Sequence, residues 1–505
     1  MRTILPASFI KLSAFVALFF VSFSVKANNV QISGIAVNGA NVTFTISWEN
    51  SWNTMDNINP LYPNNWDGVW VFVKYQNNND NLWKHAALSS LSSDHSVAGA
   101  GNVLQVDAVS DGMGVFIRRT NPGSGNISGA TITLKMGSLI GTGTFNFKVF
   151  GTEVVYVPQG DFQLGDGQVS GTFYYTAQDI TNAKQTAGLA AGALFSGSPA
   201  VPSGFPMGYN AFYCMKYEIS SEQWADFLNT LTYDQQANRT ALAPSSAKGT
   251  NPWGYMPGSH GTAYLVRIET PGANNTTPAV YGCDLDNDNI FNETNDGQNI
   301  AFNGLGKGDM LAFLDWSGLR PMTEMEFEKA CRGTQSRVSA ERAWGSTDVS
   351  VRRRNDGVIN GGTATELPTN NTASDGRINA AVGGSALGSL RCGIFAQGAT
   401  GRESSGAAFW GMMEMSGNAL EVTVYTDAAG AIFTGSHGNG NLTSTGAADV
   451  ASWPSATSDV APFGLGVRGG SWINDQSQAQ TSYRMGGLPS ARHEAYGGRG
   501  VRTAL

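Results

Sequence analysis

The sequence has 505 residues and a formal net charge of −8, with 14% charged residues and 63 glycines. A chain of this length exceeds what one ordinary hydrophobic core holds, so two or three domains are expected. Sparse charge and many glycines favour a loop-rich fold with many turns. The acidic balance and the lack of lysine-rich or arginine-rich runs argue against nucleic-acid binding.

The first 27 residues have the pattern of a secretory signal peptide. Arg2 and Lys11 precede an apolar run over residues 12–23, and Val25-Lys26-Ala27 offers a small-residue cleavage site. The run is too short and wrongly flanked for a membrane anchor, and no other long apolar run follows. We therefore expect an exported protein without a membrane span, either secreted, periplasmic or at the cell surface, whose mature chain starts at Asn28.

Residues 28–150 are predicted to form a separate all-β domain. Residues 42–48 alternate apolar and polar side chains, as a strand with one buried face does. Further strand-like runs cover residues 69–75, 114–119, 130–135 and 144–150, separated by turn-rich stretches. Several short strands with regular turns suggest a β-sandwich.

Five tryptophans in this domain could line a carbohydrate-binding platform, namely Trp48, Trp52, Trp66, Trp70 and Trp83. Large aromatic side chains more often pack in cores, so we expect core packing for most of them. Trp66 follows Asn64 and Asn65 and precedes Asp67, which makes it the best candidate for exposure. Glycan binding is therefore one alternative function.

The second predicted domain covers residues 151–505 and mixes helices with strands. Ser220 with Gln223, and Thr323 with Glu326, have the spacing of capping boxes that start helices. The residue type at Thr323 fits a helix cap rather than a nucleophile, because no base lies near it in sequence.

Four cysteines lie in the second domain, Cys214, Cys283, Cys331 and Cys392. They could form up to two disulfides with three possible pairings, or they could stay as buried thiols. The sequence leaves both possibilities open.

Residues 284–296 contain closely spaced acids. Asp284, Asp286 and Asp288 resemble positions one, three and five of an EF-hand-type calcium loop, with Asn289 where glycine normally allows the turn. Position twelve is an asparagine, and Asp296 comes one residue late. The alternatives are a calcium site and a solvated Asp/Asn loop.

Residues 409–423 are an apolar run interrupted by Gly417 and Asn418, residue types that tolerate left-handed backbone. A tight turn there lets Glu414 and Glu421 converge, and the carbonyls of Gly417 and Ala419 can point the same way. Carboxylates with carbonyl oxygens suit a hard cation such as Ca²⁺. The alternative is a plain turn with two solvated acids.

This stretch resembles a signature of the formylglycine-generating enzyme (sulfatase-modifying factor) family, and further segments resemble other family motifs in the same order. These segments are Val154–Gly165, Leu319–Gly333, Ala343-Trp344-Gly345 and Arg468–Trp472, followed by Arg484 and Gly500-Val501-Arg502. The resemblance implies a loop-rich α+β fold of the C-type-lectin-like kind for residues 151–505. It also implies that Glu414, Gly417, Ala419 and Glu421 form a structural calcium site.

The family's oxidase activity needs two cysteines, separated by four residues, that bind Cu(I) in the segment after Gly-Gly-Ser. Asn474 and Ala479 occupy those positions here, and no cysteine follows Cys392. An amide and a methyl group cannot replace the thiols. We therefore expect no copper and no formylglycine generation by the copper mechanism.

The resemblance leaves three functional hypotheses. The first is a pseudoenzyme, an exported non-catalytic member of the family that acts as a calcium-stabilised binding or scaffold module at the bacterial cell surface, with an unidentified protein or glycan partner. The second is an oxidoreductase of the formylglycine-generating or non-haem-iron superfamily with a non-standard site, for which the cleft candidates are Ser471, Asn474, His437 and Arg484. The third is glycan binding through the tryptophan-rich β-domain.

Overall fold

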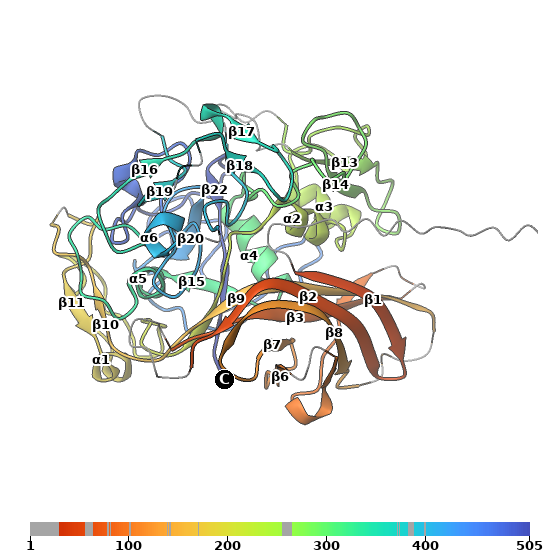
Figure 1. The fold of residues 1–505 in the computed structure, drawn as a ribbon, viewed down its shortest axis with the longest axis horizontal. Coiled ribbons are helices and arrows are strands. Elements are labelled where there is room, and N and C mark those ends of the chain that lie inside the picture. The colour runs from red at the N-terminus through yellow and green to blue at the C-terminus, as the bar shows by residue number, and fades with distance from the viewer. Residues whose placement is uncertain are drawn as a thin grey trace, which may run out of the picture.

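The computed structural model describes residues 30–505, except 56–63, 78–79, 81, 100–102, 139, 141–142, 170, 255–264, 371, 373, 382–387 and 398–399. The predicted signal peptide lies outside the described residues. Strands and loops dominate, and the helices are short (Figure 1). Within the described part of the chain, none of the helices has the length and apolar composition needed to cross a membrane.

The N-terminal region consists of two sheets that share one hydrophobic core. One sheet has the order β1-β2-β8-β5, and its strands are β1 (Gln31–Asn38), β2 (Asn41–Asn53), β8 (Gly123–Lys135) and β5 (Ser96–Ala98). The facing strands are β3 (Asp67–Asn77), β4 (Trp83–His85), β6 (Leu104–Ala108) and β7 (Val115–Arg119). Alternating side chains such as Phe44 and Ile46 on β2 pack against Val71 on β3. The alternation of apolar and polar side chains predicted for residues 42–48 is therefore confirmed by their burial in β2.

The two regions of the molecule share a continuous sheet of eleven strands. Strand β9 (Phe145–Val157) pairs with β3 of the N-terminal region and with β12 (Phe212–Met215) of the C-terminal region. The predicted boundary at residue 150 lies within β9. The sheet continues through β23 (Gly500–Thr503), β15 (Arg320–Thr323), β20 (Leu420–Val424) and β21 (Leu465–Arg468), and β22 (Tyr496–Gly497) pairs with β20. Backbone hydrogen bonds thus connect the two regions directly.

Within its described residues, the C-terminal region adds four two-stranded sheets and six α-helices. The small sheets are β10 (Phe162–Leu164) with β11 (Gln178–Ile180), β13 (Val266–Thr270) with β14 (Val280–Cys283), β16 (Ser350–Val351) with β19 (Arg377–Ile378), and β17 (Val358–Ile359) with β18 (Leu367–Pro368). The α-helices of the described residues are α1 (Asn182–Ala187), α2 (Ser221–Leu228), α3 (Tyr233–Arg239), α4 (Lys307–Trp316), α5 (Glu324–Arg332) and α6 (Arg402–Ser405).

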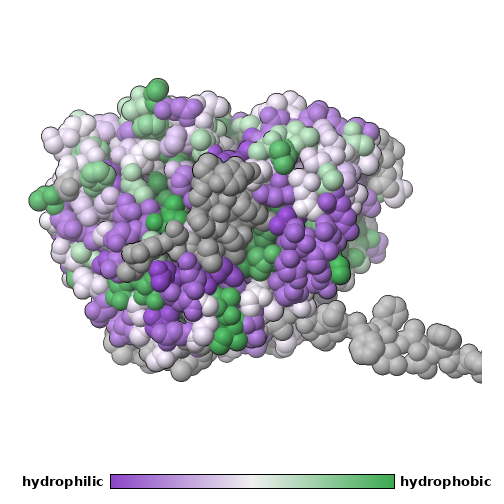
Figure 2. Space-filling model, turned by 90° about the horizontal axis from the view of Figure 1, so that it is seen from above, coloured by the Kyte–Doolittle hydropathy of each residue, from purple (hydrophilic) through white to green (hydrophobic). Residues whose placement is uncertain are grey.

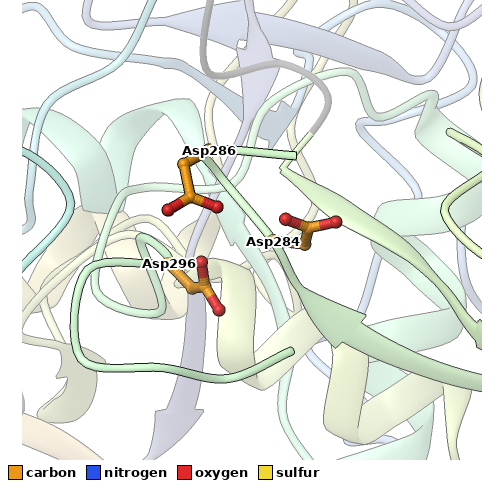
Figure 3. Close-up of side chains that lie close together, drawn as sticks. All are labelled: Asp284, Asp286 and Asp296. Carbon is orange, nitrogen blue, oxygen red and sulfur yellow. The ribbon is translucent and has the colours of Figure 1, made fainter. Parts of the chain in front are cut away.

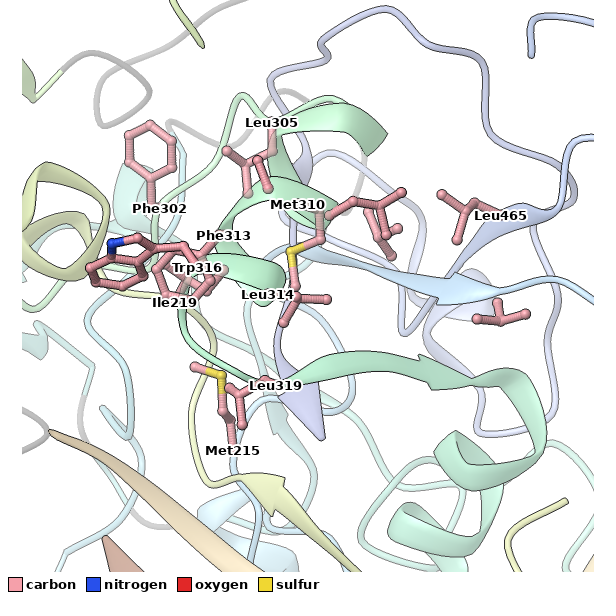
Figure 4. Close-up of a cluster of buried hydrophobic side chains, with 14 of the residues drawn as sticks. Met215, Ile219, Phe302, Leu305, Met310, Phe313, Leu314, Trp316, Leu319 and Leu465 are labelled. Atoms are coloured by element: carbon pink, nitrogen blue, oxygen red, sulfur yellow. The ribbon is translucent and has the colours of Figure 1, made fainter. Parts of the chain in front are cut away.

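Both predicted capping boxes are present. Ser220 caps α2 with Gln223, and Thr323 caps α5 with Glu326. Helix α4 lies at the centre of the largest core, where Met310, Phe313 and Leu314 meet side chains from several loops and strands (Figure 4). The local signals in the sequence therefore place these helices correctly.

The exposure expected for Trp66 is wrong. Its ring is buried and stacks on Tyr156 with 3.9 Å between ring centroids, and its Nε1 donates to the Tyr213 hydroxyl. Trp48 and Trp70 are also buried, as expected for core residues, whereas Trp52 and Trp83 are half-buried. Figure 2 shows a mixed surface on the face it displays, where coloured hydrophobic residues are scattered among hydrophilic ones.

Candidate functional site: a buried acidic cluster at the turn after Met413

The predicted turn is present and its backbone is left-handed. Gly417 has φ +88° and Asn418 has φ +65°, and Glu414 itself has φ +55°. A Cβ atom on Gly417 would lie 2.4 Å from Cγ1 of Ile378 and 2.7 Å from the carbonyl oxygen of Asn379. Glycine is therefore required both by conformation and by space at this position.

The turn brings three carboxylates into the protein interior. Glu414 and Glu421 are buried, and Glu218, which follows β12, joins them from 200 residues away in sequence. One Glu218 oxygen accepts hydrogen bonds from Asn418 Nδ2 (2.5 Å), and the other accepts one from the Ala419 backbone N–H (2.8 Å). Sequence analysis did not select Glu218 as a site residue. Its local signal is weak, because it is one acid in a short connection that also contains Lys216 and Ser220.

One arginine neutralises part of this charge. Arg499 forms an ion pair with Glu421 at 2.7 Å and donates to the backbone carbonyls of Met413, Met215 and Lys216. Arg499 acts on all three carboxylates and Arg391 acts on Glu414, so negative charge remains in excess if all three are ionised. Burial raises the pKa of Glu414 to about 7 and raises that of Glu218 well above its usual range. The cluster is thus electrostatically suited to an additional cation.

Oxygen atoms without hydrogen-bond partners among the described residues are also present. These atoms are Oε2 of Glu414, Oε2 of Glu421 and Oδ1 of Asn379. Asn379 lies beside the turn, since its carbonyl accepts from Asn418 N–H. A cavity of about 10 Å³ is lined by Glu414, Asn379, Asn418 and Ser416, among other residues. These buried oxygens have the hard character that Ca²⁺ prefers, so the residues fit the ion that the family resemblance implies.

The positions of the family's copper-binding thiols hold side chains with other contacts. Asn474 accepts a hydrogen bond from Ser471 Oγ at 2.6 Å and donates to Gln478 Oε1 at 3.0 Å. Ala479 is buried in a small apolar cluster with Trp344 and Ile378. Packing and hydrogen bonds occupy both side chains.

All four cysteines are buried thiols, which answers the question that the sequence left open. Burial raises the pKa of Cys214 to about 12 and that of Cys331 and Cys392 well above the ordinary thiol value. These thiols therefore stay protonated at neutral pH, whereas copper binding needs thiolates.

The predicted cleft residues lie in three separate networks. Ser471 bonds to Asn474, as described above. Arg484 is buried in a bidentate ion pair with Glu324, with hydrogen bonds of 2.9 and 2.8 Å.

His437 accepts a hydrogen bond from the Thr503 backbone N–H at 3.0 Å and lies 3.7 Å from Asp111 of the N-terminal region. Burial lowers the pKa of His437 to about 4, so the ring is neutral at physiological pH. Contacts with neighbouring residues thus hold each of these candidates in place, and the candidates do not share one site among the described residues.

The predicted calcium loop follows β14 and has its own geometry. Asn289 adopts φ +69°, so asparagine makes the turn for which glycine is usual. The carboxylates of Asp284 and Asp286 lie close together, and the third partner is Asp296 (Figure 3). Asp288 groups instead with Asp286 and Glu293.

Comparison with known proteins places residues 146–504 in a family model described as the sulfatase-modifying factor enzyme 1-like domain. No curated protein matches the sequence. Three solved structures resemble this one distantly. PvdO from Pseudomonas aeruginosa is 14% identical, with a TM-score of 0.32, and the match covers 70% of this chain and 95% of PvdO.

Treponema denticola variable protein 1 is 11% identical, with a TM-score of 0.31 and coverage of 70% and 96% of the two chains. A Major Tropism Determinant U1 variant is 11% identical, with a TM-score of 0.23 and coverage of 85% and 94%. These likenesses are too distant to indicate function.

Proposed function

Because the chain belongs to the sulfatase-modifying factor enzyme 1-like family, we propose that it is an exported, non-catalytic member. It would act as a calcium-stabilised binding or scaffold module at the bacterial cell surface. The observation that carries the proposal is the replacement of both copper-binding thiols by Asn474 and Ala479, whose side chains have other contacts.

The contacts of Asn474 support the loss of the oxidase reaction. Cu(I) is a soft ion that requires thiolate or thioether ligands, and Asn474 presents only an amide that is already hydrogen-bonded to Ser471 and Gln478. All four thiols of the chain are buried at other positions, and burial raises the pKa of Cys214, Cys331 and Cys392. The family's reaction would therefore have neither its ligands nor substitutes for them.

The buried acidic cluster supports the calcium part of the proposal. Glu414 and Glu421 each keep one buried oxygen without a hydrogen-bond partner among the described residues. Arg499 pairs with Glu421, and the charge of Arg391 reaches Glu414, which leaves the three carboxylates in excess. A bound calcium ion would supply the missing positive charge. Its chemistry would be structural, because it would hold the turn against β20 and β12.

The shared sheet supports a scaffold role. Strand β9 pairs with strands of both regions, so the N-terminal sheets are attached to the family domain by a hydrogen-bonded ladder instead of a flexible linker. A partner bound to one region would be held in a fixed orientation to the other. Export rests on the signal-peptide pattern of the first 27 residues.

Two measurements on the purified mature chain test the proposal together. A C-x-P-x-R peptide is incubated with the protein and Cu(I), and conversion of its cysteine to formylglycine is followed by mass spectrometry. Metal analysis is made on the same preparation. We expect no conversion, bound calcium and no stoichiometric copper. Peptide conversion above a heat-inactivated control would contradict the non-catalytic assignment.

One observation favours the glycan-binding alternative at Trp83, one of the five tryptophans of the N-terminal region. The half-buried Trp83 lines a cavity of about 210 Å³ together with Lys84, Gln235 and Asn441. An aromatic ring beside several hydrogen-bonding side chains is a combination that suits sugar rings. A glycan array with the wild type and Trp83→Ala would show binding that depends on this ring. The oxidoreductase with a non-standard site stays a prediction without a comparable observation.

A further inference from the structure

The loop between β14 and residue 297 holds a compact group of carboxylates apart from the cluster around Glu414. The chain has five acids and no lysine or arginine between residues 284 and 296. Carboxylate oxygens of Asp284, Asp286 and Asp296 all lie within 4.8 Å of one another. In Figure 3 the three side chains come from different parts of the loop and face a common space.

The spacing of these oxygens matches the size of one calcium ion. Ca²⁺ binds oxygen at about 2.3–2.6 Å, so two ligands on opposite sides of the ion lie at most about 5 Å apart. The three carboxylates lie within that limit. A single ion can therefore contact all three with only small adjustments of the side chains.

Burial of two of these acids distinguishes the group from an ordinary acidic loop. Asp284 and Asp296 are each 0% exposed. Asp284 Oδ2 and Asp296 Oδ1 have no hydrogen-bond partner among the described residues. Arg267 is the nearby cation, and its Nε lies 3.9 Å from Asp284 Oδ2. A buried ionised carboxylate is unfavourable without a cation or hydrogen bonds, so these oxygens need a positive charge.

The loop backbone already holds the other oxygens of these carboxylates in place. Asp284 Oδ1 accepts from the Asp288 N–H at 3.1 Å, and Asp296 Oδ2 accepts from the Glu293 N–H at 2.7 Å. Asp286 Oδ2 accepts from Asn295 Nδ2 at 2.9 Å, and its Oδ1 accepts from the Asp288 N–H at 3.4 Å. Hydrogen bonds thus orient all three carboxylates, and the second oxygens of Asp284 and Asp296 stay available for an ion.

We propose that Asp284, Asp286 and Asp296 form a second calcium site, independent of the cluster at Glu414 and Glu421. Asp296 takes the place of the acid that the sequence lacks at position twelve of the loop. Asp288 and Glu293 lie beside the site and strengthen its negative potential, since they group with Asp286.

The test compares calcium binding by matched variants of the full mature chain. Protein is stripped with EDTA, dialysed, and titrated with CaCl₂ in a calorimeter at pH 7.5, with bound calcium measured by atomic emission. Asp286→Asn removes an exposed ligand, so the variant should fold normally. Asp296→Asn removes a buried ligand. Asp179→Asn is the control, because it removes one exposed acid that pairs with Arg337 elsewhere.

We expect both loop variants to bind one calcium ion fewer per chain than the wild type, or to bind it more than tenfold more weakly. Asp179→Asn should match the wild type. Glu421→Gln should retain the binding event that the loop variants lose, which separates this inference from the proposed function. Unchanged calcium binding by folded Asp286→Asn would overturn the assignment. So would equal binding of Mg²⁺, because Mg²⁺ demands a stricter octahedral shell.

Discussion

The two acidic groups of this protein both contain buried carboxylates, but they differ in how the negative charge is balanced. The cluster of Glu218, Glu414 and Glu421 is wholly buried and includes its own cation, Arg499. The loop group pairs two buried acids with the exposed Asp286, and its nearest guanidinium, that of Arg267, only borders it. One group is part of the core, whereas the other opens to solvent.

This difference predicts what each group does without calcium. Arg499 makes four hydrogen bonds or ion pairs inside the protein, so the core cluster can persist when no ion is bound. The loop has no comparable counter-charge among the described residues, and its exposed members can hydrate instead. We expect the core cluster to dominate stability and the loop to respond mainly to calcium concentration.

The largest effect is expected at Glu421. Glu421→Gln leaves the buried guanidinium of Arg499 without its partner at 2.7 Å, and breaking a buried pair costs about 3–5 kcal/mol. Urea unfolding followed by circular dichroism should show that loss in the free energy of unfolding. Glu403→Gln on α6 is the matched control and should change stability by less than about 0.5 kcal/mol.

A double variant sharpens this test of the core cluster. Glu421→Gln combined with Arg499→Met removes both charges and should recover part of the lost stability. If Glu421→Gln alone is as stable as the wild type, Arg499 does not depend on this carboxylate, and the contrast between the two acidic groups fails.

The second effect is a pH dependence that arises from Glu414. Burial raises the pKa of Glu414 from 4.5 to about 7 in the folded chain. The folded state therefore binds the proton more tightly than the unfolded state. The stabilisation is complete below pH 4.5 and disappears as pH rises through 7, by about 3 kcal/mol in total.

Calcium should oppose this loss, because the ion takes the place of the proton on Glu414. Unfolding free energies between pH 4.5 and 8, measured with EDTA and with calcium, check the prediction. Glu414→Gln is the control and should show a weaker pH dependence in EDTA. Histidines with lowered pKa values, such as His437, change the stability of both proteins in the opposite direction, so the test is the difference between them. A Glu414→Gln variant with the same pH dependence as the wild type in EDTA would contradict the assignment.

Local chemistry in the sequence predicted the local structure well. The sequence predicts Ser220 and Thr323 as helix caps because the three-residue spacing to their glutamine or glutamate partners is a local signal. Gly417 and Asn418 predicted the turn because few other residues adopt positive φ. The family motifs then predicted the family that matches residues 146–504.

Contacts between distant residues were not predictable in this way. Trp66 is followed by an aspartate and looked exposed, but it stacks on Tyr156, 90 residues later. Glu218 joins Asn418 only because β12 and the turn meet in space. Asp296 is one residue late for an ideal calcium loop, yet the backbone delivers its carboxylate to Asp284. Each of these contacts depends on tertiary packing, which the spacing of residues in the sequence does not reveal.

The smallest effect is expected at Asp286. In EDTA, Asp286→Asn removes one exposed charge from a repulsive group, so the free energy of unfolding should change by less than about 0.5 kcal/mol. With calcium at a hundredfold excess over Kd, binding at the loop raises the free energy of unfolding of the wild type by about 2.7 kcal/mol. Asp286→Asn should lack this increase. Thermal unfolding in both buffers measures the difference. A loss at Asp286 in EDTA as large as that at Glu421 would mean that both acidic groups act as core elements, because only a carboxylate with a buried partner costs that much to remove.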